Sequence, residues 1–356
     1  EMEPNLAENV VAALYAPSAA VIDPWGLCIA EAETAVRNGV ELKLRSEVTG
    51  LEDKGDYVLV HTRSGDYETR VIVNCAGGWG GDICAMTGAA EWEAQPSRGE
   101  YYLLDKSSGN LVSHVIFQCP NRLGKGVLVS PTVHGNLIVG PNAVDVSAPD
   151  SRENTLSGMD FVAETSRRSV PSIDFRQSIR NFAGVRANTS ESDFIIRPAK
   201  NMPRMLHIAG IKSPGLSAAP AIAEYAAELL ESMGIALEKK DEWNGRREQI
   251  RFKQLSDEEK AALIAKDSRY GRVICRCETI TEGEIVAAIH SPIPPCSLDG
   301  IKRRAGSGMG RCQGGFCGPR VLDILARELG CSPLDIQQDG DGTFILIGTT
   351  KGGTLA

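Results

Sequence analysis

Four cysteines near the end of the 356-residue chain have the spacing of metal ligands. One residue separates Cys275 from Cys277, and four residues separate Cys312 from Cys317. Two such pairs supply four thiolates, which is the ligand number of a [2Fe–2S] cluster. Structural zinc also takes four cysteines, but usually through pairs with two intervening residues. The spacing therefore favours an iron–sulfur cluster, with zinc and free thiols as the alternatives.

Helix starts are predicted beside both cysteine pairs. The run 281–284, Thr-Glu-Gly-Glu, has the pattern of a capping box, and Gly318-Pro319 places a proline in the first turn of a second helix. The unpaired N–H groups of a helix start stabilise negative charge on sulfur. We therefore expect a small helical module at 271–335, with nearby arginines offsetting the cluster charge: Arg276, Arg303, Arg304 and Arg311.

Two further segments combine a buried strand with a turn of small residues. The strand predicted at 71–74 runs into a glycine-rich turn at 75–81, and the strand at 205–209 runs into 210–217 and an alanine-rich helix at 218–233. Such a turn lets backbone approach a ligand, and a helix start attracts negative charge. Tight packing of a helix on a sheet would explain the same composition and stays as the alternative.

Charge and hydropathy exclude several classes of partner. With 46 acidic and 38 basic residues the net charge is −8, which repels a nucleic-acid backbone. No run approaches the roughly 18 apolar residues of a membrane span, and no signal peptide opens the chain. We expect a cytoplasmic protein without direct membrane insertion, associated with a membrane only through a partner. In a reducing compartment the six cysteines outside the pairs are expected to be small buried hydrophobes.

The cysteine module resembles a known family. The sequence Cys275-Arg-Cys-Glu, the basic triplet at 302–304 and the run from Gly308 to Cys317 are similar to the bacterioferritin-associated-ferredoxin-type [2Fe–2S] domain. That domain occurs at the C-terminus of anaerobic glycerol-3-phosphate dehydrogenases. The resemblance covers about 60 residues and implies that Cys275, Cys277, Cys312 and Cys317 hold the cluster.

The small-residue turns resemble a second family. Asn74-x-Ala76-Gly77 and the run from Gly210 to Ser217 are similar to two flavin-contacting motifs of the D-amino-acid-oxidase/glycerol-3-phosphate-dehydrogenase superfamily. The resemblance implies FAD as a cofactor. The residues it implies as cofactor-binding are Val48, Asn74, Ala76, Gly77, Gly210, Ile211, Ser213, Pro214, Gly215, Leu216 and Ser217.

The sequence departs from that superfamily in one respect. Its members begin with a strand and a GxGxxG turn for the FAD pyrophosphate, and this sequence has no such motif and begins at Glu1. We therefore expect a fragment with an incomplete Rossmann-like FAD domain. The predicted fold class is α/β: an FAD-linked body at 1–235 with a sheet-rich substrate subdomain at about 95–190, a charged linker at 236–270, the helical [2Fe–2S] domain at 271–335, and a tail at 336–356.

Four residues are candidates for binding a substrate or for taking part in its conversion. Arginine grips phosphate or carboxylate through two parallel hydrogen bonds, so Arg186 and Arg98 are predicted anion anchors. His134 is a candidate base or flavin neighbour, and Lys212 adjoins the predicted flavin loop. Structural roles stay open for all four: ion pairs for the arginines and packing for His134.

Together these features predict a relay. Substrate would reduce FAD by two electrons, and the [2Fe–2S] cluster would pass them singly to an electron-accepting subunit or quinone-linked partner. The resemblance implies sn-glycerol 3-phosphate as the small anionic substrate. A 2-hydroxy acid such as 2-hydroxyglutarate or a secondary amine remains open, because one scaffold serves several chemistries. A non-catalytic electron-transfer subunit is the alternative from another class.

Overall fold

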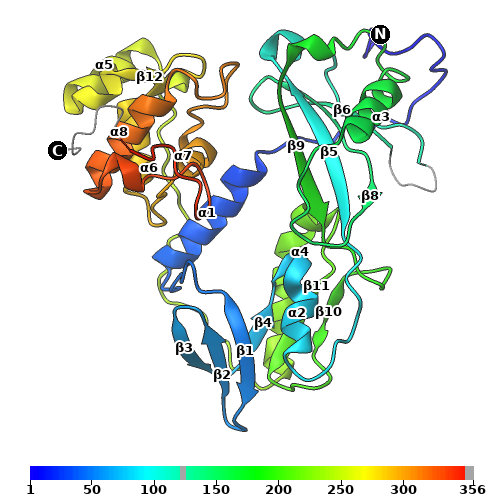
Figure 1. Ribbon diagram of the computed structural model, residues 1–356, viewed down its shortest axis with the longest axis vertical. Coiled ribbons are helices and arrows are strands. Elements are labelled where there is room, and N and C mark those ends of the chain that lie inside the picture. Colours follow the sequence, from blue (N-terminus) through cyan, green and yellow to red (C-terminus); the bar gives the residue numbers. More distant parts are fainter. Residues whose placement is uncertain (121–125, 349–356) are drawn as a thin grey trace. The chain divides into compact units, whose positions relative to one another are not determined.

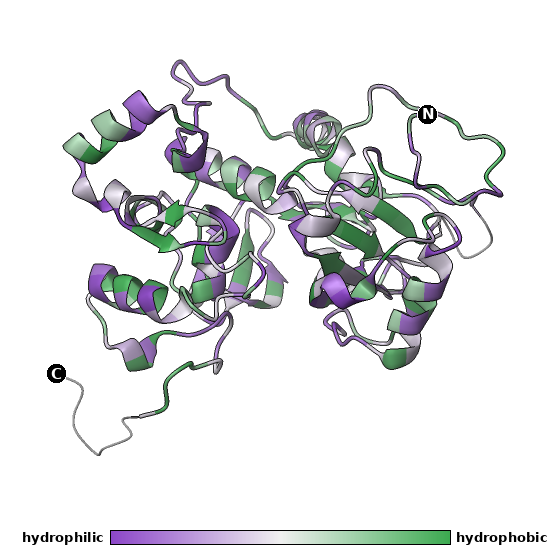
Figure 2. Cartoon of the chain, turned by 90° about the horizontal axis from the view of Figure 1, so that it is seen from above, coloured by the Kyte–Doolittle hydropathy of each residue, from purple (hydrophilic) through white to green (hydrophobic). Residues whose placement is uncertain are grey.

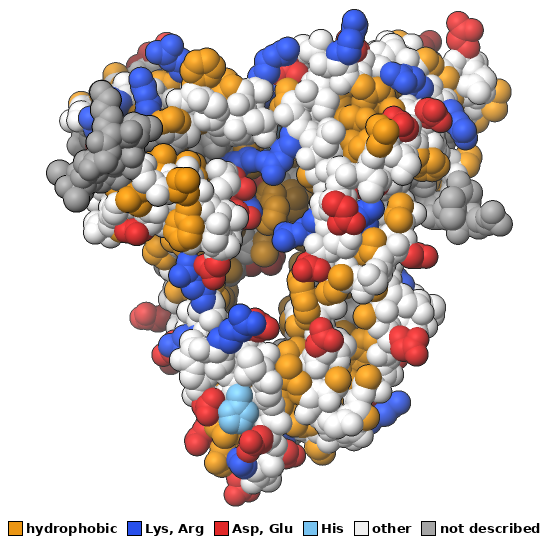
Figure 3. All heavy atoms as spheres, viewed as in Figure 1, with side chains coloured by type: hydrophobic (Ala, Val, Ile, Leu, Met, Phe, Trp, Pro, Cys, Tyr) orange, Lys and Arg blue, Asp and Glu red, His pale blue; other side chains and the backbone are white. Residues whose placement is uncertain are grey.

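The computed structural model describes residues 1–120 and 126–348, and its chain divides into two compact units. The first unit comprises 1–17 and 42–241, and the second comprises 18–41 and 242–356. The second unit thus takes the segment 18–41, which we had placed in the flavin-linked body, together with the predicted linker and the cysteine module. On the face of the chain that Figure 3 shows, acidic and basic side chains are interspersed.

The largest sheet lies in the first unit (Figure 1). Its central strand β5 (Ser97–Leu104) pairs antiparallel with β9 (Ser178–Arg186), β7 (Leu137–Gly140) and β8 (Val144–Asp145), and β7 pairs with β6 (Leu128–Pro131). Leu104, Leu137 and Val139 are fully buried beneath helix α3 (Leu156–Ser166). The sheet-rich middle predicted at about 95–190 is therefore present. The sequence also predicts a strand at 114–117, but of this segment only a single bridge from Ile116 to Val129 forms.

A smaller sheet joins segments that are far apart in the sequence. Strand β4 (Ile72–Asn74) runs parallel to β11 (Met205–Ala209), which pairs antiparallel with β10 (Ile195–Pro198). Asn74 lies opposite His207 in this register. The chain then enters helix α2 (Gly80–Ala85) after β4 and helix α4 (Gly215–Ser232) after β11. Since both strands are parallel, both turns leave the same edge of the sheet.

The β-branched runs at 57–61 and 69–74, on either side of the turn at 63–66, predict a hairpin, which forms with different bounds. Strands β1 (Val48–Asp53), β2 (Val58–Thr62) and β3 (Gly65–Thr69) make an antiparallel meander. The apolar run at 69–74, expected to be one hairpin strand, divides between β3 and the parallel strand β4. The reason is that Ile72 and Val73 pair with β11 instead of β2. The pattern of neighbouring residues cannot reveal a strand partner that lies more than a hundred residues away in the sequence.

Helices dominate the second unit. They are α1 (Pro24–Arg37), α5 (Asp257–Lys266), α6 (Glu282–Ile289), α7 (Leu298–Ala305) and α8 (Gly318–Leu329), with the short strands β12 (Val273–Cys275) and β13 (Ile280–Thr281). Ile285, Ile301 and Leu325 are fully buried in their shared core. Hydrophobic and hydrophilic residues alternate along the helices (Figure 2). The capping box predicted at Thr281 is present. The run Ser256-Asp-Glu-Glu predicts a second one, which opens α5.

Helix α1 is held in the second unit by polar contacts. The Arg247 guanidinium lies 2.6 Å from the buried Glu33 carboxylate, and the Arg303 guanidinium stacks 5.0 Å over the Trp25 ring. These contacts explain why an N-terminal helix packs with the C-terminal module. Among the residues the structure describes, no helix is both long enough and apolar enough to cross a membrane.

We expect Leu104→Ala to lower the free energy of unfolding of the first unit by about 2–5 kcal/mol, because it removes a fully buried side chain and leaves a cavity. Leu156→Ala is the matched control. Its side chain is 81% exposed at the start of α3, so the change should stay within about 0.5 kcal/mol. Denaturant unfolding followed by circular dichroism measures both, and equal losses would contradict the assigned core.

Candidate functional site

The four predicted cysteine ligands come together in the second unit. Cys275 ends β12, Cys317 caps the start of α8, and their thiols are hydrogen-bonded to each other. The Cys277 and Cys312 sulfurs lie 3.8 Å apart. Cys275 and Cys317 are buried at 1% and 2% exposure, whereas Cys277 is exposed and Cys312 is half-buried. Two loops far apart in sequence thus offer one set of four sulfur ligands.

Backbone N–H groups stabilise negative charge at this set. Those of Gly308 and Glu278 donate to the Cys275 sulfur, and those of Phe316 and Gly314 donate to the Cys312 sulfur. The hydrogen bond from Cys317 is the main cause that lowers the pKa of Cys275 to about 6. The same bond raises the pKa of Cys317.

The pKa of Cys312 is also lowered, chiefly by the Phe316 N–H, while burial raises the pKa of Cys277. Thiolate therefore forms most readily at one member of each sulfur contact, Cys275 and Cys312. Binding of a metal centre would displace the remaining protons, since the thiolate is the ligand.

Glycines make room for a cluster beside these sulfurs. A Cβ atom at Gly310 would lie 2.4 Å from the Cys277 Cβ, and Gly308 and Gly314 have φ angles of +88° and +89°. Side chains at these positions would clash or strain the loop. The all-sulfur ligand set, its N–H donors and this space fit a [2Fe–2S] cluster.

Two of the four arginines predicted to offset the cluster charge have other partners. Arg303 makes two hydrogen bonds of 2.8 Å to Asp339, and Arg304 donates to the carbonyl oxygens of Gly300 and Ile293. Their role is therefore structural. Arg276 and Arg311, directly beside Cys277 and Cys312, are exposed.

A second site, a pocket of about 530 Å³, lies in the first unit. It lies where the turns after β4 and β11 meet the end of β9. The predicted residues that line it are Gly77, Arg186, Ile211, Lys212, Ser213, Pro214, Gly215, Leu216 and Ser217. The structure therefore brings one predicted arginine, the predicted lysine and most of the predicted flavin loop to one place.

The start of α4 gives this pocket an attraction for anions. No acidic residue occupies its first turn and no side chain caps it, so its N–H groups face the loop without a competing carboxylate. The Nη1 atom of Arg186 is buried and has no hydrogen-bond partner among the residues that the structure describes. A Cβ atom at Gly215 would lie 2.4 Å from the Ile211 side chain, so the loop closes here only on glycine. These features fit the negative end of a flavin or an anionic substrate.

The remaining predicted cofactor residues lie outside the lining of this pocket. Asn74 is buried behind it, where its amide donates to the Gly80 carbonyl (2.9 Å) and accepts from the Ala76 N–H (3.2 Å). Asn74 thereby shapes the turn that carries Gly77. Gly210 begins the second loop with a φ of +63°. Val48 lies in the separate β1–β3 meander, and the structure does not bring it to the pocket.

Arg98, the second predicted anion anchor, does not line this pocket. In the β5–β9 register Arg186 lies opposite Ser97, so the side chain of Arg98 emerges on the other face of the sheet. There it is 5% exposed and forms an ion pair with Glu153. The structure therefore places Arg98 apart from Arg186, with the ion pair that the structural alternative expects.

His134 also lies away from the pocket. It sits in the turn between β6 and β7, at the end of β5 where Leu104 pairs with Leu137. Arg186 pairs at the opposite end of β5. Seven residues of strand separate these ends, roughly 20 Å at about 3.3 Å per residue. The prediction that His134 neighbours the flavin is therefore not supported.

Three pocket residues were missed in the sequence: Gly78, Val185 and Ala187. The double glycine at 77–78 was a usable signal for the first of them. The other two flank Arg186 on β9, and only the pairing of β9 with β5 brings them to the loop. A second missed feature is a buried polar cluster of Cys84, Glu91 and His207, whose ligand-type atoms all lie within 4.8 Å of one another.

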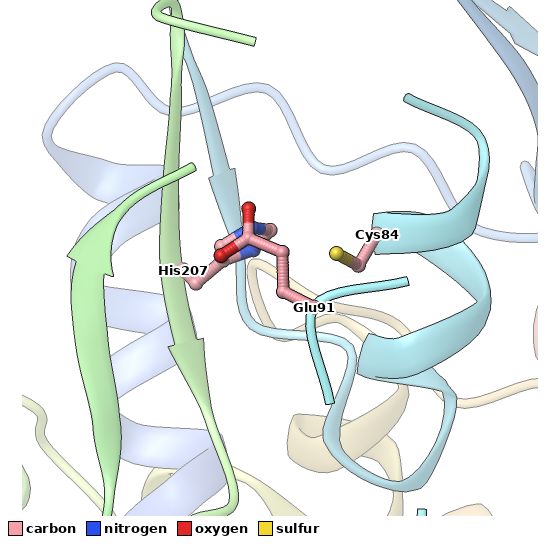
Figure 4. Close-up of side chains that lie close together, drawn as sticks. All are labelled: Cys84, Glu91 and His207. Carbon is pink, nitrogen blue, oxygen red and sulfur yellow. The ribbon is translucent and has the colours of Figure 1, made fainter. Parts of the chain in front are cut away.

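Figure 4 shows these three side chains converging from α2, the segment after it, and β11. Their contacts favour a hydrogen-bonded group over a metal site. The two bonds of the Asn74 amide fix its orientation, so its NH₂ faces His207 Nδ1 at 3.3 Å as a donor. We infer that Nδ1 accepts and that Nε2 carries the proton, 3.6 Å from Glu91.

A protonated Nε2 has no lone pair for a metal ion. The Arg197 guanidinium, 3.7 Å from the Glu91 carboxylate, supplies the positive charge that this buried acid needs. Burial lowers the pKa of His207, which keeps the ring neutral. The cluster is therefore a structural support beneath the turn shaped by Asn74.

Comparison with known proteins gives two family matches. The model described as "FAD dependent oxidoreductase" matches residues 1–229, and the one described as "BFD-like [2Fe-2S] binding domain" matches residues 273–327. These matches confirm both predicted resemblances. They also favour iron–sulfur over zinc for the four cysteines.

Individual relatives agree with the family matches. The chain is 49% identical to a glycerol 3-phosphate dehydrogenase of Caloramator mitchellensis, over 99% of this chain and 73% of that protein. It is 34% identical to a glycerol 3-phosphate oxidase of Mycoplasma genitalium, over 68% of this chain but only 64% of that protein. A Mycoplasma pneumoniae L-alpha-glycerophosphate oxidase structure with FAD bound aligns with a TM-score of 0.57 at 32% identity, covering 61% of this chain and 57% of that one.

We expect Cys277→Ser to lower the iron and sulfide content of the chain and to weaken its visible absorption, because a hydroxyl is a poor substitute for a cluster thiolate. Cys296→Ser is the control, since Cys296 is a free thiol in the same unit outside the ligand set. The expectation that the six other cysteines are buried is wrong for Cys296 and holds only for Cys84. Iron and acid-labile sulfide assays with a visible spectrum measure the outcome. Unchanged cluster content in Cys277→Ser would remove Cys277 from the ligands.

We expect His207 to make the first unit less stable in mild acid. Because its pKa in the folded chain is lowered, the unfolded chain binds a proton below about pH 6.5 that the folded chain excludes. The free energy of unfolding should then fall as pH drops below that value, by up to about 1.4 kcal/mol per pH unit. His207→Gln should flatten this part of the profile. Urea unfolding between pH 5 and 7 tests it, and parallel profiles would refute the assignment.

Proposed function

Because the chain belongs to the FAD-dependent oxidoreductase family and carries a BFD-like [2Fe-2S] binding domain, we propose that it is an FAD-linked dehydrogenase of sn-glycerol 3-phosphate. It would pass electrons through the cluster to a separate acceptor. The relative from Caloramator, a glycerol 3-phosphate dehydrogenase, supports this choice of substrate. The chain covers 73% and 64% of the first two relatives, so the activity of a whole protein is part of the proposal.

The observation that carries the proposal is the pocket at the start of α4. It combines an arginine with an unpartnered buried Nη1 atom, a lysine, and a helix N-terminus without acidic residues. A phosphate monoester is the kind of ligand that such a set attracts, since arginine binds it bidentately and the helix dipole favours its charge. A carboxylate would bind by the same contacts, which keeps a 2-hydroxy acid as the alternative substrate.

We assign separate tasks to the residues of the pocket. The Arg186 guanidinium would hold the substrate phosphate, and Lys212 would add a second positive charge beside it. The turn at Gly77 and the loop 211–217 would hold FAD, with backbone N–H groups of the α4 start beside the flavin ring. When bound, FAD supplies the hydride acceptor for oxidation of a carbinol carbon. The chain contributes binding and orientation, which place the reacting carbon.

The cysteine module favours a dehydrogenase over an oxidase. An oxidase passes electrons from flavin to oxygen and needs no one-electron relay. The four converging sulfurs and their N–H donors provide the site of such a relay. The acceptor is therefore proposed to be a separate electron carrier.

The direct test is anaerobic addition of sn-glycerol 3-phosphate to the chain loaded with FAD and with its cluster intact. We expect bleaching of the flavin band, followed by an electron paramagnetic resonance signal of a reduced [2Fe–2S] cluster. 2-Hydroxyglutarate and a secondary amine are the comparison substrates. If flavin binds but no substrate reduces it, the dehydrogenase proposal fails; a cluster without flavin binding would favour an electron-transfer subunit.

We expect Arg186→Ala to raise the KM for sn-glycerol 3-phosphate by about 10–100-fold, because truncation removes a buried charge partner of the phosphate. The expected effect on kcat is smaller. Arg180→Ala is the matched control, since Arg180 is exposed on the same strand at its other end. Steady-state kinetics with an artificial electron-accepting dye would measure both. A KM equal to that of the parent chain would exclude Arg186 as the phosphate anchor.

A further inference from the structure

The cysteine site has one covered side and one open side. Cys275 and Cys317 are almost fully buried against the helical core, whereas Cys277 is exposed and Cys312 is half-buried. The two more accessible sulfurs are also the two that lie 3.8 Å apart. An electron crosses to another protein most readily where a redox centre comes nearest to the surface. The Cys277–Cys312 side is therefore the exit that the fold leaves open.

An aromatic side chain stands exposed beside this exit. Phe316 lies in the loop between Cys312 and Cys317, and its side chain is 86% exposed. Its backbone N–H donates to the Cys312 sulfur, so the residue lies directly at the site. An exposed phenylalanine adds nothing to the stability of the unit. Aromatic residues in such positions are typical anchors of protein interfaces.

Three basic residues lie close to the ligand cysteines in the sequence. Arg276 adjoins Cys277, Arg311 adjoins Cys312, and Arg320 follows Phe316 by four residues, and all three are exposed. Arg320 stands in the first turn of α8, which has no acidic residue, so its charge opposes the helix dipole. Each of these exposed arginines thus lies within three residues of a ligand cysteine, although the whole chain carries −8.

We propose that Arg276, Arg311, Phe316 and Arg320, which we name the exit face, form the docking surface for an acidic electron-accepting protein. This inference rests on the proposed function only in requiring a reducible [2Fe–2S] cluster. Each docking event transfers one electron: the cluster loses it, the partner gains it, and no bond or proton changes. Phe316 packs on the partner, and the arginines steer a negatively charged surface toward the exit.

Compensation of the cluster's own negative charge would also place arginines here. That explanation accounts for Arg276 and Arg311 but not for the exposed Phe316. The two explanations also predict different effects when one of these residues is substituted. Loss of a compensating charge shifts the reduction potential of the cluster, whereas loss of a docking residue weakens binding at an unchanged potential.

The test uses two electron acceptors of opposite charge, an acidic plastocyanin and a basic cytochrome c. The full chain is reduced with stoichiometric dithionite, and stopped-flow absorbance follows its reoxidation by each acceptor at several salt concentrations. We expect the rate with plastocyanin to fall steeply as salt increases, and the rate with cytochrome c to be lower at low salt. Because dithionite reduces the cluster directly, this result does not depend on any substrate.

Variants identify the residues responsible. Phe316→Ala should slow transfer to plastocyanin by about tenfold with an unchanged cluster spectrum and reduction potential, since the N–H donor to Cys312 is retained. Arg276→Glu combined with Arg311→Glu should slow it by about 10–100-fold and reverse the salt dependence. Trp243→Ala and Lys266→Glu are the matched controls, an exposed aromatic and an exposed basic residue elsewhere in the unit, and should have no effect.

Three outcomes would overturn the proposal. Faster transfer to cytochrome c than to plastocyanin at low salt would exclude an acidic partner. An equal rate for Phe316→Ala and Trp243→Ala would remove Phe316 from the surface. Slower cluster reduction by sn-glycerol 3-phosphate in the exit-face variants, with unchanged transfer to plastocyanin, would assign the face to the internal donor instead. Failure of that substrate to reduce the parent chain would count against the proposed function alone.

Discussion

The parallel pairing of β4 with β11 is the constraint on which the first unit depends. Each strand is short, yet the register that sets Asn74 beside His207 joins segments more than 130 residues apart. Because the strands run in the same direction, the turns that leave them emerge at one edge of the sheet. The glycines after β4 and the loop before α4 can therefore line one pocket. Binding sites at the carboxyl ends of parallel strands follow from this geometry.

The cysteine site of the second unit is built by another principle. Its ligands lie within 43 residues of one another, from Cys275 to Cys317, and short elements hold them: a two-stranded ladder, a capping box and the start of α8. Glu284 contributes twice, since it closes the Thr281 capping box and accepts the Phe252 N–H. The module has its own buried core beneath Cys275 and Cys317. Local order and a compact core thus position four sulfurs without long-range strand pairing.

This difference explains what the sequence could predict. The four cysteines, both capping boxes and the flavin-type loop were found because each is encoded by neighbouring residues. Arg98 and Arg186 could not be told apart, because only the β5–β9 register sets one in the pocket and the other beneath the sheet. The place of His134, in the turn at the other end of β5, depends on the same strand pairing. The spacing of apolar residues at 27–38 predicts a helix, and α1 is there. Its place in the second unit depends on Glu33 and Arg247, which are 214 residues apart.

The loop before α4 shows that packing and binding are not competing explanations of a small-residue turn. Gly215 lies so close to Ile211 that any larger residue would force the loop open. In this closely packed loop the Gly215 N–H donates to the Lys212 carbonyl, and no side chain caps the start of α4. The same closeness places Lys212 and Arg186 around this helix start. A tight turn is in this case the means by which the fold keeps an anion site open, so the structural and functional interpretations of the sequence describe one arrangement.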